Sequence, residues 1–237
     1  MSAVNADALR CVQDAAVSRV PQESIQSEAI RIGPLGLYGD LTHVTPGKGF
    51  VVFAHGSGSS RASPRNRRVA GVLHEYGLST LLFDLLTEDE AERRANVFDI
   101  ELLSQRVVGT LDWLAARHDT AQQPAGLFGA STGAAAALCA AAERPAQVAA
   151  VVSRGGRPDL ALQALQQVRC PTLLIVGGDD PEVLQLNRQA LAALRCDKRL
   201  EVVPGATHLF EEPGALDLVA RLAGAWFADR FEPAKTP

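Results

Sequence analysis

The five residues 129–133, Gly-Ala-Ser-Thr-Gly, place a serine between two glycines in the pattern G-x-S-x-G. A short apolar run at 124–128 precedes the pattern, and an alanine-rich helix is expected at 134–142. Between a strand and a helix, the two glycines allow a sharp turn that carries the serine hydroxyl at its tip. The pattern predicts Ser131 as a nucleophile for acyl transfer. The N–H of Thr132 is expected to point at the position where an oxyanion would form.

His208 is the candidate general base. A serine hydroxyl is a weak nucleophile at neutral pH and needs a base, which in turn needs an orienting group. His208 lies in the loop after the last expected strand and is the one histidine that follows Ser131, as the chain order serine, acid, histidine requires. A histidine of a surface loop is the alternative interpretation. His55 is expected to support the loop after its own strand and not to act as the base.

Two adjacent aspartates compete for the role of orienting acid. Asp179 and Asp180 both follow the strand expected at 171–176. A G-x-x-D spacing from Gly177 favours Asp180, and a G-x-D spacing favours Asp179; we choose Asp180 because the usual spacing in this type of site favours it. The other aspartate is expected to cap the next helix. Asp84, at the end of a neighbouring strand, is a weaker rival.

The second donor to the oxyanion is expected in the glycine-rich loop after the strand at 50–54. Gly56 and Gly58 allow the backbone of this loop to approach a ligand closely. We choose the N–H of Ser57, so that Ser57 and Thr132 together form the predicted oxyanion hole. A phosphate-binding turn is the alternative, but the loop has neither a Walker lysine nor the spacing G-x-G-x-x-G.

These residues require a sheet that brings strand ends together. Runs of β-branched and aromatic residues without alternation indicate strands that are buried on both faces of a parallel sheet. We expect an α/β fold with a doubly wound, mostly parallel, eight-stranded sheet and an antiparallel N-terminal hairpin. The expected strands are 24–32, 35–44, 50–54, 78–83, 124–128, 148–153, 171–176 and 200–203. Further helices are expected at 63–76, 99–116, 158–168, 181–194 and 216–227.

The remaining segments are expected to contribute little to the core. Residues 1–22 are predicted to be a loosely ordered leader, and residues 23–237 a single domain. The charged stretch from Thr87 to Arg94 is predicted to be a solvated connection.

Composition excludes several classes of function. The chain has 237 residues, of which 47% are hydrophobic and 21% charged, as in a globular protein with a sizeable core. The net charge of −4 comes without a long run of either sign, which is unlike a nucleic-acid-binding protein. Charges interrupt residues 1–20, and no stretch reaches the ~18 apolar residues of a membrane span. We therefore expect a cytoplasmic protein without nucleic-acid or membrane partners.

The cysteines do not predict a metal site. They lack C-x-x-C spacing and a histidine in ligand register, and they are Cys11, Cys139, Cys170 and Cys196. We interpret them as buried or half-buried thiols in a reducing compartment. No metal and no cofactor are expected.

Three features occur in the order of a known superfamily: residues 55–58 (His-Gly-Ser-Gly), residues 129–133, and the pair Asp180 and His208. With them the chain resembles an α/β-hydrolase, and within that superfamily the dienelactone-hydrolase-like proteins. The resemblance covers roughly residues 24–230. Dienelactone hydrolases proper carry a cysteine nucleophile, whereas this chain has Ser131, so the resemblance implies general ester hydrolysis. Similar sequences sometimes form part of a phosphoribosyltransferase fusion.

We interpret the chain as a serine hydrolase that cleaves short-chain carboxylic esters of small molecules through an acyl-enzyme. The same residues could transfer the acyl group to an amine, thiol or peroxide, as in an acyltransferase, thioesterase, peptidase or perhydrolase. A non-catalytic binding module is the alternative from another class. The complete set of candidate residues favours an enzyme.

Only residues 154–157 and one short helix follow the strand at 148–153, where a lid is commonly inserted. So minimal a lid predicts a shallow cleft that prefers acyl chains of about two to six carbons, without interfacial activation. Arg61, Arg154 and Arg157 are expected near its mouth, either tolerating anionic acyl groups or as solvated surface side chains.

Overall fold

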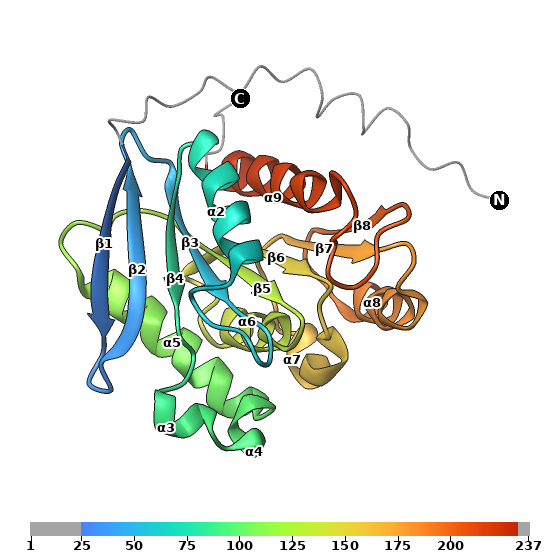
Figure 1. Cartoon of the computed structure of the whole chain (residues 1–237), viewed down its shortest axis with the longest axis horizontal. Helices are drawn as coiled ribbons and strands as arrows, with labels where there is room; N and C mark the ends of the chain where they lie inside the picture. Colours follow the sequence, from blue (N-terminus) through green and yellow to red (C-terminus); the bar gives the residue numbers. More distant parts are fainter. Residues whose placement is uncertain (1–24, 232–237) are drawn as a thin grey trace.

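The fold is an eight-stranded sheet covered by helices on both faces, in a computed structural model that describes residues 25–231 (Figure 1). The predicted leader lies outside the described residues. The strand order is β1-β2-β4-β3-β5-β6-β7-β8. The strands are β1 (Ile25–Ile32), β2 (Leu37–Val44), β3 (Gly49–Ala54), β4 (Leu78–Phe83), β5 (Ala125–Ala130), β6 (Val148–Arg154), β7 (Thr172–Gly177) and β8 (Lys198–Val203).

The pairing of the strands matches the hydrophobic pattern. β2 runs antiparallel to both β1 and β4, and every other neighbouring pair is parallel. Every residue of β3, β4 and β7 is buried, because helices cover both faces of the parallel part of the sheet. The predicted mostly parallel sheet with its antiparallel hairpin is therefore confirmed.

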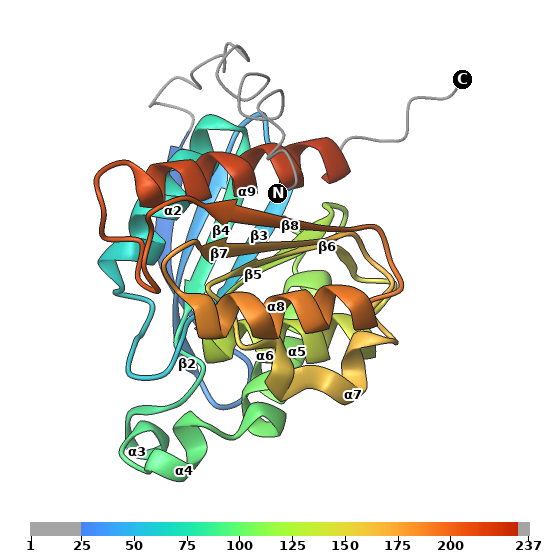
Figure 2. The same ribbon diagram turned by 90° about the vertical axis from the view of Figure 1, so that its right-hand side faces the viewer.

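Two hydrophobic clusters lie on opposite faces of the sheet. Figure 2 shows α2 and α9 on one face and α5, α6 and α8 on the other. The longer helices are α2 (Pro64–Glu75), α5 (Ile100–Ala116), α6 (Thr132–Glu143), α8 (Pro181–Ala193) and α9 (Ala215–Phe231). None of the helices between residues 25 and 231 combines the length and apolar character needed to cross a bilayer.

The segment between β4 and α5 is exposed to solvent, as predicted, but it is also helical. It forms two short helices without buried residues, α3 (Glu88–Ala91) and α4 (Arg94–Val97). The cause is a capping box in which Thr87 Oγ1 accepts from the N–H of Glu90 and the Glu90 carboxylate accepts from the N–H of Thr87. Glu90 also accepts a 2.6 Å bond from Arg106 on α5, so these charges fix the segment to the fold.

The connection between β6 and β7 is short, as expected. It holds one 3₁₀ turn, η2 (Pro158–Ala161), and one turn of α-helix, α7 (Leu162–Leu165). The predicted helix at 158–168 is thus broken in two and ends early, and no lid domain is inserted at this point.

The parallel register brings the ends of β3, β5, β6 and β7 to one edge of the sheet. Ala54 of β3 pairs with Gly129 of β5, and Ala130 of β5 pairs with Arg154 of β6. Arg154 pairs in turn with Ile175 of β7. The residues that follow these strands therefore meet at the carboxyl edge, where ligands of open α/β sheets bind.

The contact of α6 with β3 gives a testable prediction about stability. A Cβ atom on Gly133 would lie 2.2 Å from the carbonyl oxygen of Ala54, so Gly133→Ala should destabilise the fold by about 1–3 kcal/mol. Gly109 lies exposed in α5 with no neighbouring atom within 4 Å, so Gly109→Ala should stabilise it by about 1 kcal/mol. Urea unfolding of both variants measures the difference. Equal midpoints would contradict the packing that we describe.

Candidate functional site

Ser131 occupies a strained turn between β5 and α6. Its φ is 52° and its ψ is −122°, and among the described residues only Ser131 and Phe210 are non-glycine residues with positive φ. Strain of this kind persists only where the surroundings fix it, and it is concentrated at functional sites. The surroundings are tight here, because a Cβ atom on Gly129 would lie 2.4 Å from the Cα of Ala134. The glycines of the pattern therefore permit the turn that the sequence predicted.

The loop after β8 brings His208 to Asp180. The Nδ1–H of His208 donates to Oδ2 of Asp180 over 2.7 Å, which leaves Nε2 of the ring as an acceptor. The Asp180 side chain is 13% exposed and the His208 side chain 38% exposed, so the carboxylate is sheltered while the ring reaches solvent. This is the arrangement in which an acid fixes the tautomer of a base.

The rival acids do not contact His208. Asp179 is exposed, and its backbone N–H donates to the carbonyl of Ala206. Asp84 accepts from both the backbone and the guanidinium of Arg61. The expectation that the losing aspartate caps the next helix is wrong, because Asp180 itself is the N-cap residue of α8 and makes no side-chain cap bond. Its carboxylate is bonded to His208 instead.

Contacts with the end of β6 place Ser131 and His208 at the same strand end. The N–H of Ser131 donates to the carbonyl of Arg154 over 3.2 Å. A Cβ atom on the next residue, Gly155, would lie 3.6 Å from Cε1 of the His208 ring. No hydrogen bond joins Ser131 Oγ to that ring, although both residues are described. Such contacts are often long without substrate and shorten when it binds.

The predicted oxyanion donors are partly engaged. The N–H of Ser57 donates to Oγ1 of Thr132 over 2.9 Å, so this N–H is not free in the structure. Thr132 is the first residue of α6, and its own N–H has no intrahelical acceptor. Sequence spacing could not predict the hydrogen bond between Ser57 and Thr132, because that bond depends on the rotamer of Thr132.

His55 holds the loop after β3. Its Nδ1–H donates to the carbonyl of Gly56 over 3.0 Å, and its Nε2 accepts from the N–H of Leu85 over 3.1 Å. Burial lowers the pKa of His55, which favours the neutral ring that both bonds require. The ring thus ties the ends of β3 and β4 together, as the sequence led us to expect.

A cavity of about 420 Å³ opens beside this loop. Its walls come from residues 55–61, from the segment after β4 and from α3 and α4. Leu85, Leu86 and Val97 give it an apolar side. It borders the nucleophile through Gly56, where a Cβ atom would lie 3.1 Å from the Cβ of Ser131.

The three arginines of the predicted mouth have different environments. Arg61 pairs with Asp84, and Arg157 pairs with Asp159 over 2.8 Å. Arg154 is 8% exposed, so the expectation of a solvated surface side chain is wrong for this residue. The two-residue period of the strand could have predicted that Arg154 is buried, because Ala150 and Val152 on the same face of β6 are buried.

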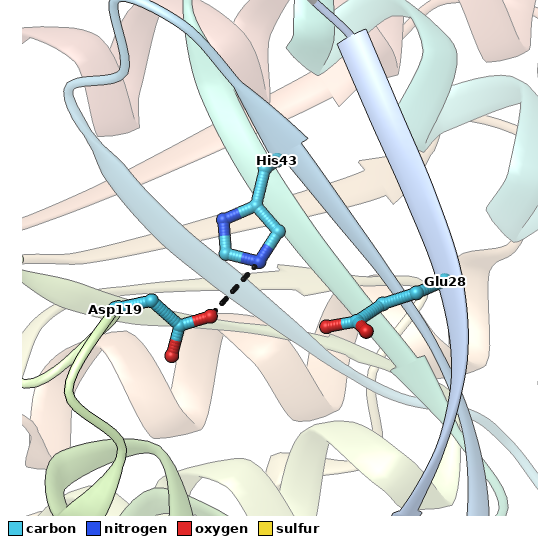
Figure 3. A group of neighbouring side chains, drawn as sticks. All are labelled: Glu28, His43 and Asp119. Carbon is cyan, nitrogen blue, oxygen red and sulfur yellow. Dashed lines mark ion pairs between the residues drawn. The ribbon is translucent and has the colours of Figure 1, made fainter.

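One cluster could be mistaken for a metal site. Glu28, His43 and Asp119 point toward one another (Figure 3), and His43 Nε2 lies 3.5 Å from Asp119 Oδ2. Arg117 donates to both carboxylates, at 2.7 Å to Asp119 and 3.1 Å to Glu28, and so already supplies the positive charge. Asp119 precedes β5, at the edge of the sheet opposite Ser131. We interpret the cluster as a surface ion-pair network.

The described cysteines are free thiols. Cys170 is buried, and Cys139 and Cys196 are half-buried, as expected for these three; Cys11 lies outside the described residues. Burial raises the pKa of Cys139, and it raises that of Cys170 to about 12. These two thiols, of Cys139 and Cys170, are therefore held in the protonated, poorly nucleophilic form.

Comparison with known proteins identifies the family. The family model described as the dienelactone hydrolase family matches residues 42–226. A Mycobacterium tuberculosis protein provisionally named a phosphoribosyl transferase is 56% identical over 218 residues, which cover 91% of this chain and 49% of that protein. The chain thus spans about half the length of this curated relative.

Solved structures agree with the family model. A dienelactone hydrolase from Anabaena variabilis has a TM-score of 0.84 and 55% identity, over 87% of this chain and 98% of that one. Est1E from Butyrivibrio proteoclasticus has a TM-score of 0.72 and 14% identity, over 85% and 98% of the two chains, and so shares the fold. The chain belongs to the dienelactone hydrolase family and has the α/β-hydrolase fold.

Proposed function

We propose that this chain is a serine hydrolase that cleaves short-chain carboxylic esters through an acyl-enzyme on Ser131. The observation that carries the proposal is the strained turn of Ser131 at the sheet edge that also holds the His208–Asp180 pair. In the proposed reaction, Nε2 of His208 accepts the proton of Ser131 as its oxygen attacks the ester carbonyl. The protonated ring then gives that proton to the leaving alcohol. In the second half of the reaction, water gives a proton to His208, attacks the acyl-enzyme and releases the carboxylic acid, and the ring returns the proton to Ser131.

Asp180 acts in this proposal by fixing the ring. Its 2.7 Å bond keeps the proton on Nδ1 and leaves Nε2 unprotonated, so that Nε2 can accept the proton of Ser131. It also stabilises the imidazolium that forms during each step. A carboxylate that is only 13% exposed does this well, because little water screens it.

The proposed oxyanion hole uses the N–H groups of Thr132 and Ser57. The first is supported by its position at the N-terminus of α6, where the helix dipole also favours negative charge. The N–H of Ser57 must release Oγ1 of Thr132 and donate to the substrate oxygen instead. That exchange replaces a neutral hydrogen bond by a charge-assisted one as the oxyanion develops.

The cavity beside residues 55–61 is the proposed acyl pocket. Its volume of about 420 Å³ and its apolar wall suit a short chain. α3 and α4 close its far side, so the pocket is bounded by the connection after β4 and not by a lid after β6.

Other acyl acceptors would use the same residues, so acyl transfer, thioester or amide cleavage and perhydrolysis remain alternatives within this mechanism. We do not extend the name of the M. tuberculosis relative to this chain, which covers only 49% of that protein.

The first prediction tests the nucleophile. Ser131→Ala should lower kcat for p-nitrophenyl butyrate by about 10⁴-fold or more, and His208→Ala should fall to a similar floor, because such residues act as a unit. Ser27 is exposed on β1, at the far edge of the sheet, so Ser27→Ala serves as the matched control. Retention of more than about a hundredth of kcat in Ser131→Ala would refute the covalent mechanism.

The second prediction separates the two aspartates. Asp180→Asn should lower kcat by about 10³–10⁴-fold, because an amide lets the ring take the wrong tautomer. Asp179→Asn changes an exposed side chain and should stay within about threefold of the unsubstituted enzyme. Steady-state kinetics of both variants decide the matter. Equal losses, or the reverse order, would overturn the assignment of the acid.

The third prediction concerns acyl length. Each buried methylene contributes ~0.8 kcal/mol, so kcat/KM should rise about fourfold per carbon until the pocket is full. We expect the optimum within about two to six carbons on a series of p-nitrophenyl esters.

Two variants check that the cavity sets this limit. Val97→Trp, on the pocket wall, should shift the optimum to shorter chains. Phe98→Trp changes an exposed neighbour outside the pocket and should leave it in place. An optimum at ten carbons or longer, or an equal shift in both variants, would rule out the assigned pocket.

A further inference from the structure

Two cysteines lie opposite each other where β7 and β8 begin. Thr172, the first residue of β7, pairs with Lys198, the first residue of β8. A 2.8 Å bond from the N–H of Thr172 to the carbonyl of Asp197 fixes this end of the ladder. Continuing the same register by two residues places Cys170 opposite Cys196. Neighbouring strands lie ~4.8 Å apart, which is within the Cα separation of about 4.4–6.8 Å that a disulfide requires.

Both thiols belong to the same face of the sheet, the face that α8 covers at β7 and β8 (Figure 2). Cys170 is part of the hydrophobic cluster on this face, and Cys196 packs against that cluster. Side chains alternate along a strand, so residues separated by an even number share a face. Leu174 of β7 and Leu200 of β8 lie an even number of residues further on and contact the same cluster. The packing therefore agrees with the register.

One buried hydroxyl group connects the two cysteines. The Sγ of Cys196 donates to Oγ1 of Thr172 over 3.7 Å, and this Oγ1 donates to the carbonyl of Cys170 over 3.2 Å. The Cys196 thiol is thus held against the beginning of β7, on the side of Cys170. Burial raises the pKa of Cys170, and negative charge on Cys196 raises it further, so the two sulfur atoms lie within electrostatic range of each other.

The two thiols differ in their access to solvent. Cys170 is 5% exposed, whereas Cys196 is half-buried. A small reagent in solution therefore reaches Cys196 first, and Cys170 is placed to react second. The remaining described cysteine, Cys139 on α6, is also half-buried, but only burial raises its pKa, and no second thiol among the described residues contributes. Cys139 therefore serves as a control for a thiol without a neighbouring thiol.

We propose that Cys170 and Cys196 are a redox modification site, which a peroxide converts into a reversible disulfide. With hydrogen peroxide, the Cys196 sulfur attacks one oxygen, the O–O bond breaks, and a sulfenic acid and one water form. The Cys170 sulfur then attacks the Cys196 sulfur, so that an S–S bond forms and the remaining oxygen leaves as a second water. The two thiols lose two electrons and two protons, and the peroxide takes up both. Because the sulfenic acid is neutral, Cys196 no longer opposes the ionisation of Cys170 in this second step.

The disulfide would close a loop around the proposed acid. Residues 170–196 contain β7, Asp180 and α8, and a bond between the ends of this loop restricts the unfolded chain. The cysteines precede β7 and β8, whereas Asp180 and His208 follow these strands at the opposite edge of the sheet. We therefore expect the oxidised protein to be more stable while its site keeps its geometry. The proposal does not depend on the esterase activity.

Peptide mapping tests the bond directly. The folded protein is treated with hydrogen peroxide, alkylated to block free thiols, and digested without a reductant. Mass spectrometry should find one linked pair of peptides, which contain Cys170 and Cys196, and dithiothreitol added before alkylation should abolish it. In Cys170→Ser the second thiol is missing, so dimedone should label Cys196 as a sulfenic acid. Cys139→Ser, the matched control, should form the linked pair to the same extent as the unsubstituted protein.

Thermal unfolding measures the consequence of the bond. Peroxide treatment should raise the melting temperature by about 5 °C or more in the unsubstituted protein and in Cys139→Ser, and it should not raise it in Cys170→Ser or Cys196→Ser. Cys170→Ala repeats both measurements should the serine variant fail to fold. Oxidation of Cys196 to a sulfinic acid without a linked pair, or linkage of Cys196 to Cys11 or Cys139 instead, would overturn the proposal. Neither readout uses ester hydrolysis, so failure here leaves the proposed function standing, and the reverse also holds.

Discussion

The structure depends on one close approach, in which α6 begins directly beneath the ends of β3 and β5. Ser131 keeps a φ of 52° because the backbone on both sides of it is closely packed. Gly129 lies against α6, and Gly133 lies against the carbonyl of Ala54. The same approach brings Gly56 against Ser131 and the Ser57 N–H against Thr132. Such rigid packing holds a nucleophile and its hydrogen-bond donors in place before substrate binds. Preorganisation of this kind accounts for much of the rate enhancement at such sites.

Charge at this edge of the sheet is distributed unevenly. Asp180 faces His208, and Asp84 faces Arg61, so these two half-buried acids have basic partners. Arg154 is the exception, since it sits deep in the fold beside a second arginine. A fold selected for stability alone would remove such a charge.

The sequence predicted the sheet well because buried parallel strands read as unbroken apolar runs, as in β3 and β4. Ser131 and His208 followed from motif and chain order. The features it missed depend on side-chain partners that are remote in the sequence. Glu90 accepts a hydrogen bond from Arg106, sixteen residues away, which holds the solvated charged stretch in a helical conformation that the sequence did not predict. Likewise, spacing could not tell that Thr132 Oγ1 would accept the Ser57 N–H.

The acyl-enzyme on Ser131 is the central claim, and mass spectrometry tests it most directly. The enzyme is mixed with p-nitrophenyl butyrate, quenched in acid during turnover, and analysed intact and after digestion. The account predicts one butyryl group per chain, carried by the peptide that contains Ser131, and a larger fraction of acylated chains when deacylation is slowed by low pH. Turnover without any adduct, or an adduct on another residue such as Cys139, would contradict it.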